Sequence, residues 1–164
     1  MATLVATRGA ASFPVFKGEG SGAVCVAYGT YDVTADPSPN DDYTMCRVPA
    51  GAVILGGNLY AADLDTNGSE TLDLDVGWRA NGGSGTYDAV DLDGLGNFGV
   101  ITGDAFAGGN VSNVTGVNYP LAGLLVTGVL PSFTKETTIV VTAIDDAATL
   151  TAGALTVVVY YVVP

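Results

Sequence analysis

Hydrophobic and polar positions alternate along much of the chain, a pattern typical of β-strands that bury one face. The clearest case is the segment 69–78. Its apolar residues share one parity and its carboxylates the other: Leu72, Leu74, Val76 and Trp78 against Asp73 and Asp75. We predict a strand that is packed on one face and solvated on the other. Trp78 is in phase with the apolar set, so it is expected in the core and not in a sugar-stacking platform with Tyr87 and Phe98.

Strand patterns recur elsewhere in the chain. They cover 23–33, 43–48, 52–62, 137–144 and 154–163, and turn-rich segments such as 36–42 and 145–153 separate them. Gly56 and Gly57 predict a bulge or kink. Residues 117–130 predict two short strands. The Gly-rich segment 79–116 offers only single helical turns, at 87–92 and 103–107.

The last strand, 154–163, is apolar at both parities. A strand with one wet face should alternate, so both faces of this one are expected to be covered. It is then either a central strand of the molecule or a strand that meets another protein.

Roughly seven to nine short strands without an amphipathic helix predict an all-β protein, an antiparallel β-sandwich that is jelly-roll-like. The length of 164 residues suits one domain, which we place at 23–164. Residues 1–22 are small, Gly-rich and irregular, and predict an extended N-terminal arm. Phe13 and Phe16 in that arm are expected to dock either on the same sandwich or on a neighbouring subunit.

Charge is sparse and one-sided. The chain has 5 Lys and Arg against 17 Asp and Glu, a formal net charge of −12. Nucleic-acid binding and anionic membranes both require clustered cations, so neither is expected as a partner. The absence of histidine removes Ser-His-Asp catalysis and His-based zinc sites. Nothing singles out a catalytic pair among the acids, and we expect no enzyme and no catalytic residue.

The remaining signals concern compartment and redox state. The N-terminus lacks the basic and apolar regions of a secretory signal, and no apolar run is long enough to span a bilayer. These features predict synthesis in a cytoplasm. In that compartment Cys25 and Cys46 are expected as buried thiols, although pairing stays open.

Two acidic motifs deserve comparison with metal sites. Asp63, Asp65 and Asn67, followed by Gly68, resemble the start of a calcium loop, but the twelfth position is Leu74 and not a Glu. The favoured interpretation is a type I′ hairpin turn at Asn67-Gly68. We therefore expect no cofactor and no metal, with calcium at Asp63, Asp65 and Asn67 as the alternative.

The second acidic motif contains Asp88, Asp91 and Asp93, which are expected as solvated loop charge, with a weak divalent-cation site as the alternative. The adjoining residues 94–99 match G-x-G-x-x-G. No helix follows them, and a dinucleotide site would require one.

Four features together resemble small β-rich virion proteins of tailed bacteriophages: the Met-Ala-Thr-Leu start, the segments Val48–Leu55 and Leu72–Gly77, and the Val/Thr-rich last strands. The resemblance extends over most of residues 20–163. It implies a capsid decoration (cement) protein on the outside of an icosahedral head. Its partners would then be the major capsid protein and copies of itself, as a trimer or other homo-oligomer. Negative charge suits an outer surface.

Under this hypothesis the chain stabilises the head by bridging capsomers, without chemistry. The contact candidates are Phe13, Phe16, Tyr160 and Tyr161. Two alternatives stay open. One is a carbohydrate- or receptor-binding sandwich of a phage tail or fibre, and the other is a tail-tube or head-completion subunit.

Overall fold

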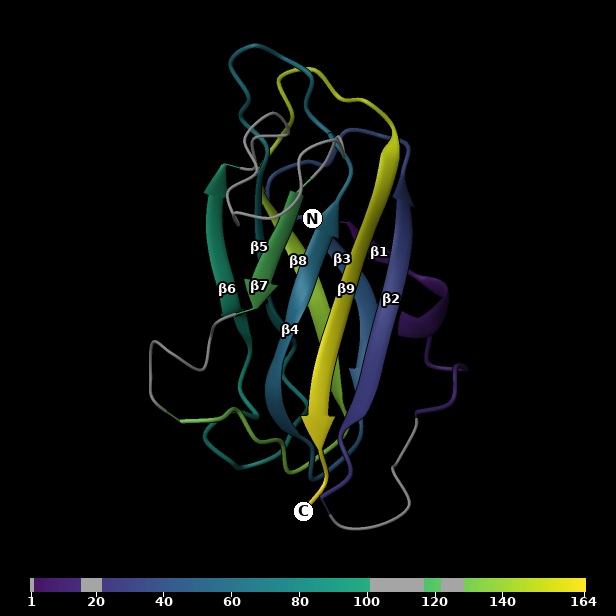
Figure 1. Ribbon diagram of the computed structural model, residues 1–164, viewed down its shortest axis with the longest axis vertical. Coiled ribbons are helices and arrows are strands. Elements are labelled where there is room, and N and C mark those ends of the chain that lie inside the picture. The colour runs from purple at the N-terminus through teal and green to yellow at the C-terminus, as the bar shows by residue number, and fades with distance from the viewer. Residues whose placement is uncertain (1, 16–21, 101–116, 122–128) are drawn as a thin grey trace.

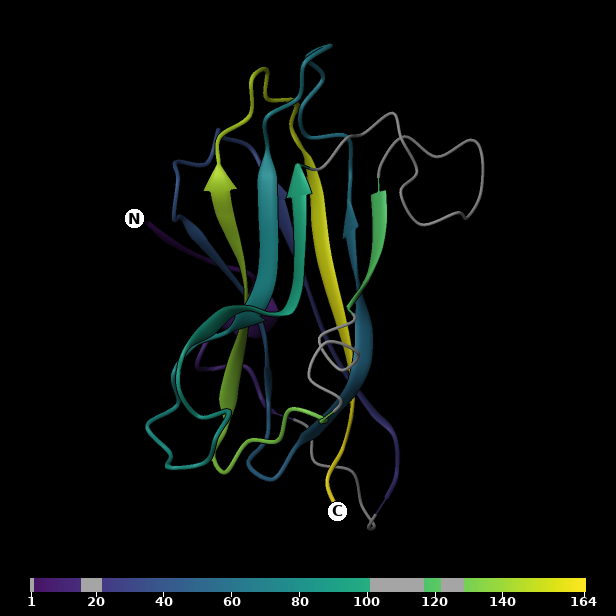
Figure 2. The same ribbon diagram turned by 90° about the vertical axis from the view of Figure 1, so that its left-hand side faces the viewer.

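Two β-sheets pack face to face in the computed structural model, which describes residues 2–15, 22–100, 117–121 and 129–164 (Figure 1). The strand orders are β1-β3-β8-β5-β6 and β2-β9-β4-β7. The strands are β1 Thr3–Val5, β2 Cys25–Val33, β3 Asp42–Val48, β4 Val53–Ala61, β5 Asp73–Trp78, β6 Asp91–Val100, β7 Val117–Leu121, β8 Thr137–Asp145 and β9 Gly153–Val162. Figure 2 shows the two layers edge-on. The all-β sandwich predicted from the sequence is confirmed.

The pairing of the strands is nested. β2 pairs with β9, β3 with β8, β4 with β7 and β5 with β6, all antiparallel. The chain from β2 to β9 is therefore folded like one long hairpin, in which each pair joins a strand of the first arm to a strand of the second. Successive pairs lie in alternate sheets. Hydrogen bonding of β4 to β9 and of β5 to β8 then joins two such pairs within each sheet.

Most strands lie where the alternation predicts them. The bulge at Gly56 is confirmed, since the β4–β9 register shifts between Ile54 and Gly56 and Gly56 has φ 148°. The hairpin predicted at Asn67-Gly68 is wrong. Neither residue has a positive φ, and the segment connects β4 in one sheet to β5 in the other.

Strand β6 was not predicted. Helical periodicity over 87–92 was expected instead, and residues 91–100 are a strand. The glycines that obscure the pattern are needed for close packing: a Cβ on Gly94 would collide with the Trp78 ring, and one on Gly77 with the backbone of Asp91. The expected turn at 103–107 lies outside the described residues.

The first described residues run along the edge of the five-stranded sheet. β1 pairs with β3 in parallel, and the 3-10 turn η1, Thr7–Gly9, follows it. The backbone N–H of Ala6 donates to the carbonyl of Thr44 at 2.9 Å. Part of the segment expected as an arm therefore belongs to the sheet. In the described part of the chain, no helix is long and apolar enough to cross a membrane.

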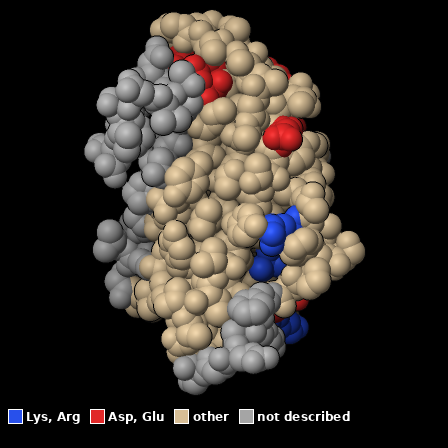
Figure 3. All heavy atoms as spheres, turned by 45° about the vertical axis from the view of Figure 1, so that its right-hand side comes forward, with Lys and Arg blue, Asp and Glu red and all other residues tan. Residues whose placement is uncertain are grey.

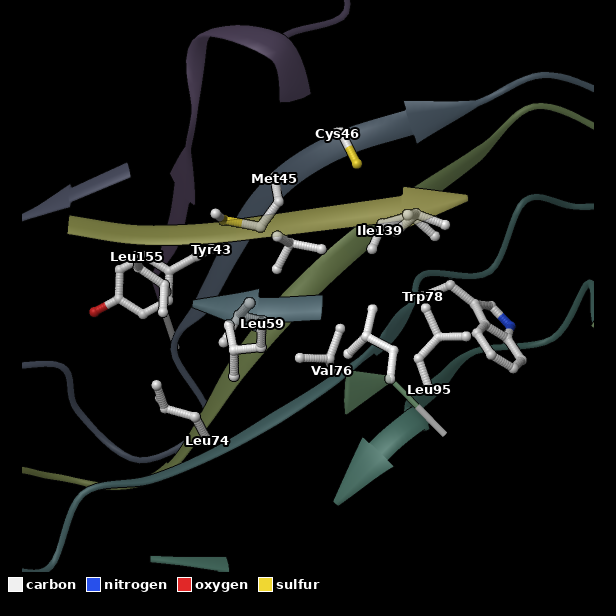
Figure 4. Packing of buried hydrophobic residues seen from close by; sticks show 14 of the residues in the cluster. Tyr43, Met45, Cys46, Leu59, Leu74, Val76, Trp78, Leu95, Ile139 and Leu155 are labelled. Carbon is white, nitrogen blue, oxygen red and sulfur yellow. The ribbon is translucent and has the colours of Figure 1, made fainter. Parts of the chain in front are cut away.

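The core fills the space between the sheets with side chains from both (Figure 4). Trp78 is 1% exposed, makes edge-on contacts with Phe133 and Tyr87 at centroid distances of 5.3 and 6.1 Å, and donates from Nε1 to the carbonyl of Ala89 at 2.9 Å. Its predicted core position is confirmed. Cys25 and Cys46 are both buried and unpaired with each other. Burial raises the pKa of the Cys46 thiol to about 12.

Candidate functional site

The outer surface of β2, β9 and β4 is an exposed apolar face. Its strands lie at the front of Figure 1, where no other described strand crosses in front of them. The exposed members are Val24, Val26, Tyr28, Leu55, Tyr60 and Tyr160, with exposed fractions of 36–64%. The cross-strand pairs Val26–Tyr160, Tyr28–Val158 and Thr30–Thr156 make the face continuous from β2 to β9. We call these residues the apolar face.

The face carries few charges. Asp32 is the one acid among the residues of β2, β4 and β9. Figure 3 shows this side of the molecule with a broad tan surface and only small blue and red areas. A contiguous apolar patch on a chain of net charge −12 is a feature of interaction sites, because isolated soluble surfaces rarely keep one.

Strand β9, whose sequence is apolar at both parities, contributes to this face. It is a central strand, paired with β2 on one side and β4 on the other. Its inner residues Leu155, Val157 and Val159 are fully buried, whereas Tyr160 on its outer face is 38% exposed. The central-strand alternative is therefore confirmed, but among the described residues the expectation that both faces are covered is wrong. The outer face of β9 has the apolar composition of a buried strand, and no described part of the chain buries it.

The contact residues predicted from the sequence have different positions. Tyr160 lies on the apolar face. Tyr161 is 1% exposed and points into the core, so its side chain does not reach the surface. Phe13 is half-buried beside Arg8, whose Cζ lies 4.8 Å from its ring centroid. Phe16 lies outside the described residues. Tyr28 and Tyr60 were missed although both lie in predicted strands, because the side of a strand that faces outward depends on how the sheets pack, which the sequence does not give.

The proposed calcium residues form a different kind of structure. Asp65 is 2% exposed and accepts backbone N–H groups through both carboxylate oxygens, from Asn67, Thr71, Leu72, Ala148 and Thr149. Burial opposes ionisation of Asp65, but the N–H groups of Thr71 and Thr149 outweigh it and lower its pKa to about 2. Oδ1 of Asn67 accepts from the Ser69 N–H at 2.9 Å. Asp65 thus ties the β4–β5 connection to the loop before β9.

This geometry leads to a prediction for calcium. Because backbone donors occupy the oxygens of Asp65, we expect millimolar Ca²⁺ or EDTA to change the melting temperature by less than about 1 °C, against several degrees for a ligand that binds the folded state tightly. Differential scanning fluorimetry would measure the shift. The matched control is Asp65→Asn, which should lower the melting temperature with or without Ca²⁺. A calcium-dependent rise that Asp65→Asn abolishes would contradict this interpretation.

Asp88 is not solvated loop charge, contrary to expectation. It is 2% exposed and accepts hydrogen bonds from the side chain and N–H of Thr134, the side chain of Asn81 and the N–H of Gly85. The Thr134 hydroxyl contributes most, and these donors hold the pKa of Asp88 well below its usual range despite burial. Asp88 therefore joins the loop after β5 to the loop before β8, at a structural position.

The outer face of the five-stranded sheet is acidic, and it is less solvated than the alternation predicts. Asp75 is 5% exposed and Asp42 is 0% exposed. Oδ1 of Asp75 is buried without a hydrogen-bond partner. Burial is the main cause that raises the pKa of Asp75 to about 6, and Asp73 and Asp93 add to it. Among the described residues, no group of three or more acids or cysteines has the geometry to hold a metal ion.

Comparison with known proteins gives structural matches only. No family model and no curated protein matches the sequence. A chain of the cyanophage Pam1 capsid asymmetric unit matches with a TM-score of 0.60 and 26% identity, covering 94% of this chain and 95% of that one. A chain of the capsid of Ralstonia phage GP4 matches with a TM-score of 0.69 and 18% identity, covering 99% of both chains. The resemblance to phage virion proteins is confirmed at this level: the structural neighbours are phage capsid chains.

Proposed function

We propose that this chain is a non-enzymatic structural protein of a phage head. It decorates the outside of the capsid and bridges neighbouring capsomers by laying its apolar face on the major capsid protein. The observation that carries the proposal is the open outer surface of β9, whose composition is that of a buried strand. The whole-length likeness to two phage capsid chains supports the same class of function.

The two faces of the sandwich suggest an orientation. The outer surface of the five-stranded sheet carries Asp73, Asp93 and Asp145, whereas the apolar face is nearly free of charge. Burying the apolar face against the shell removes hydrophobic surface from water. The acidic surface then faces the solvent, where it favours solubility. A protein that binds only the assembled lattice stabilises that lattice through its binding free energy.

The first test uses heads that lack the protein. Deleting its gene should give heads that lose their genome at a lower temperature, and adding the purified protein should restore wild-type heat resistance. Electron microscopy of the restored heads should show density on the outer surface at capsomer junctions. Binding inside the shell, binding to tails only, or unchanged heat resistance would overturn the proposal. Binding to tails would favour the receptor-binding or tail-tube alternatives.

The apolar face itself is tested by substitution. Val26→Asp should weaken binding to these heads at least about tenfold, because a carboxylate on the apolar face would be desolvated in the contact. The matched control is Ile144→Asp, which adds the same charge at a residue that is 41% exposed on the other sheet. Co-sedimentation of labelled protein with heads gives both affinities. Equal losses in the two variants would show that the apolar face is not the docking surface.

A further inference from the structure

Arg8 is held between two aromatic rings at the edge of the apolar face. Its Cζ lies 3.9 Å from the Tyr28 ring centroid and 4.8 Å from that of Phe13, and Nη2 donates to the Tyr28 hydroxyl at 2.6 Å. Tyr28 belongs to the apolar face and is 43% exposed. The guanidinium therefore lies directly beside the surface that we propose docks on the capsid.

The main chain around Arg8 is fixed on the sheet edge. A Cβ on Gly9 would collide with the backbone of Thr44, so η1 sits tightly on β3. The side chain of Arg47 then donates to the carbonyls of Ala11 and Phe13. A small pocket opens beside this anchored segment, lined on one side by Phe13 and Val15 and on the other by Val26 and Tyr28.

Arg8 differs from the other described arginines in its partners. Arg47 is ion-paired with Glu136, and Arg79 with Asp42. Within residues 2–15, 22–100, 117–121 and 129–164, the contacts of Arg8 are to aromatic rings and a hydroxyl, and no carboxylate lies within ion-pairing distance of it. Among the described residues, the Arg8 guanidinium therefore lies at the edge of the apolar face without a carboxylate partner, in a chain that has 17 acids and 5 bases.

We propose that Arg8 and the adjoining pocket receive an acidic side chain, flanked by an apolar residue, from the capsid subunit on which the apolar face docks. This inference rests on the proposed function. A guanidinium binds a carboxylate through two parallel hydrogen bonds. One of the five N–H donors of Arg8 is bonded to the Tyr28 hydroxyl, which leaves four for such a carboxylate. The two rings hold the side chain in place, so little rotamer freedom is lost on binding. The pair would lie at the rim of the contact, where the neighbouring apolar surface strengthens it while salt can still screen it.

The test measures binding to heads that lack the protein, at low and high salt. Arg8→Met keeps the contact with both rings but removes the charge, and it should weaken binding about tenfold at low salt. The loss should be smaller at 0.5 M salt, since a rim ion pair is screened. Arg8→Lys should recover part of the affinity. Lys135→Met is the matched control: it changes net charge equally on a loop where Lys135 contacts the Gly82 carbonyl, and it should leave affinity within about twofold.

The outcomes separate the two proposals. If wild-type protein fails to bind heads, the proposed function fails and this inference fails with it. If wild-type protein binds and Arg8→Met binds equally well with the same salt dependence, only this inference is overturned. Melting temperatures of all variants should lie within a few degrees of wild type, and Tyr28→Phe provides a milder variant at the same place should Arg8→Met unfold.

Discussion

Replacing Arg79 by Met is expected to destabilise the protein by about 3 kcal/mol at pH 7. Asp42 on β3 is completely buried, and the guanidinium of Arg79, which follows β5, is its cationic partner. Met keeps much of the aliphatic stem but leaves a buried carboxylate without a counter-charge. Breaking such a pair costs about 3–5 kcal/mol. The lower value applies because the Arg79 side chain is 34% exposed and the Thr142 hydroxyl still donates to Asp42 Oδ1 at 2.7 Å.

Urea unfolding measures this loss as a lower midpoint with an unchanged m-value. Two further variants identify its cause. Adding Asp42→Asn to Arg79→Met should recover part of the stability, since no unpaired charge is then buried. Glu136→Gln breaks the Arg47 pair, whose acid is 46% exposed, and should cost less than about 1 kcal/mol. Equal losses for Arg79→Met and Glu136→Gln would show that burial of Asp42 does not govern the effect.

The limits of sequence reasoning are clear at β5. Alternation correctly assigns Leu74, Val76 and Trp78 to the core, because side-chain period follows from strand geometry. It does not reveal what lies over the opposite side. Gly77 is covered by the main chain of Asp91 and Leu92, which belong to a strand that the glycines conceal. Burial of Asp75 is thus a tertiary effect that no local pattern contains.

At the candidate site, too, the sequence predicted the features of single strands but not the contacts between distant segments. The apolar character of both sides of β9 was visible in the sequence, and Tyr160, predicted as a contact candidate, is exposed. The residue next to it, Tyr161, was grouped with it although strand geometry sends neighbours to opposite faces. The contact of Arg8 with Tyr28 spans 20 residues and that of Arg79 with Asp42 joins different strands. Such pairs depend on strand order, which the sequence left undetermined.

Asp75 is the charged group whose environment opposes its charge most plainly. Oδ1 is buried without a partner, and the neighbouring ionisable groups are acids: Asp73 on the same strand and Asp93 on β6. Asp145 on β8 lies opposite Asp73 in register and adds to the negative field. Burial first, and these carboxylates second, raise the pKa of Asp75 to about 6 from the ordinary aspartate value of 3.8, against the opposing effect of the Phe98 backbone N–H. The folded protein therefore binds a proton at Asp75 more tightly than the unfolded chain does.

A raised pKa in the folded state means that the stability contributed by this proton is fully present below about pH 4 and is lost as the pH rises through about 6. Asp75→Asn, which cannot ionise, should accordingly be more stable than wild type at pH 7.5 by about 2 kcal/mol, a value that allows for partial screening.

At pH 4 most of the difference in urea midpoint should be gone, because Asp75 is then protonated in the folded state and about two-fifths protonated in the unfolded one. Asp93→Asn is the matched control at an exposed neighbour, and it should gain less than about 1 kcal/mol at pH 7.5. Below pH 4 both proteins should weaken together, since Asp65 has a pKa of about 2 and loses its hydrogen-bonded ionised form there. If Asp75→Asn is less stable than wild type at pH 7.5, the buried carboxylate is stabilising in its ionised form and the acidic side of the sandwich must hold a cationic partner for it.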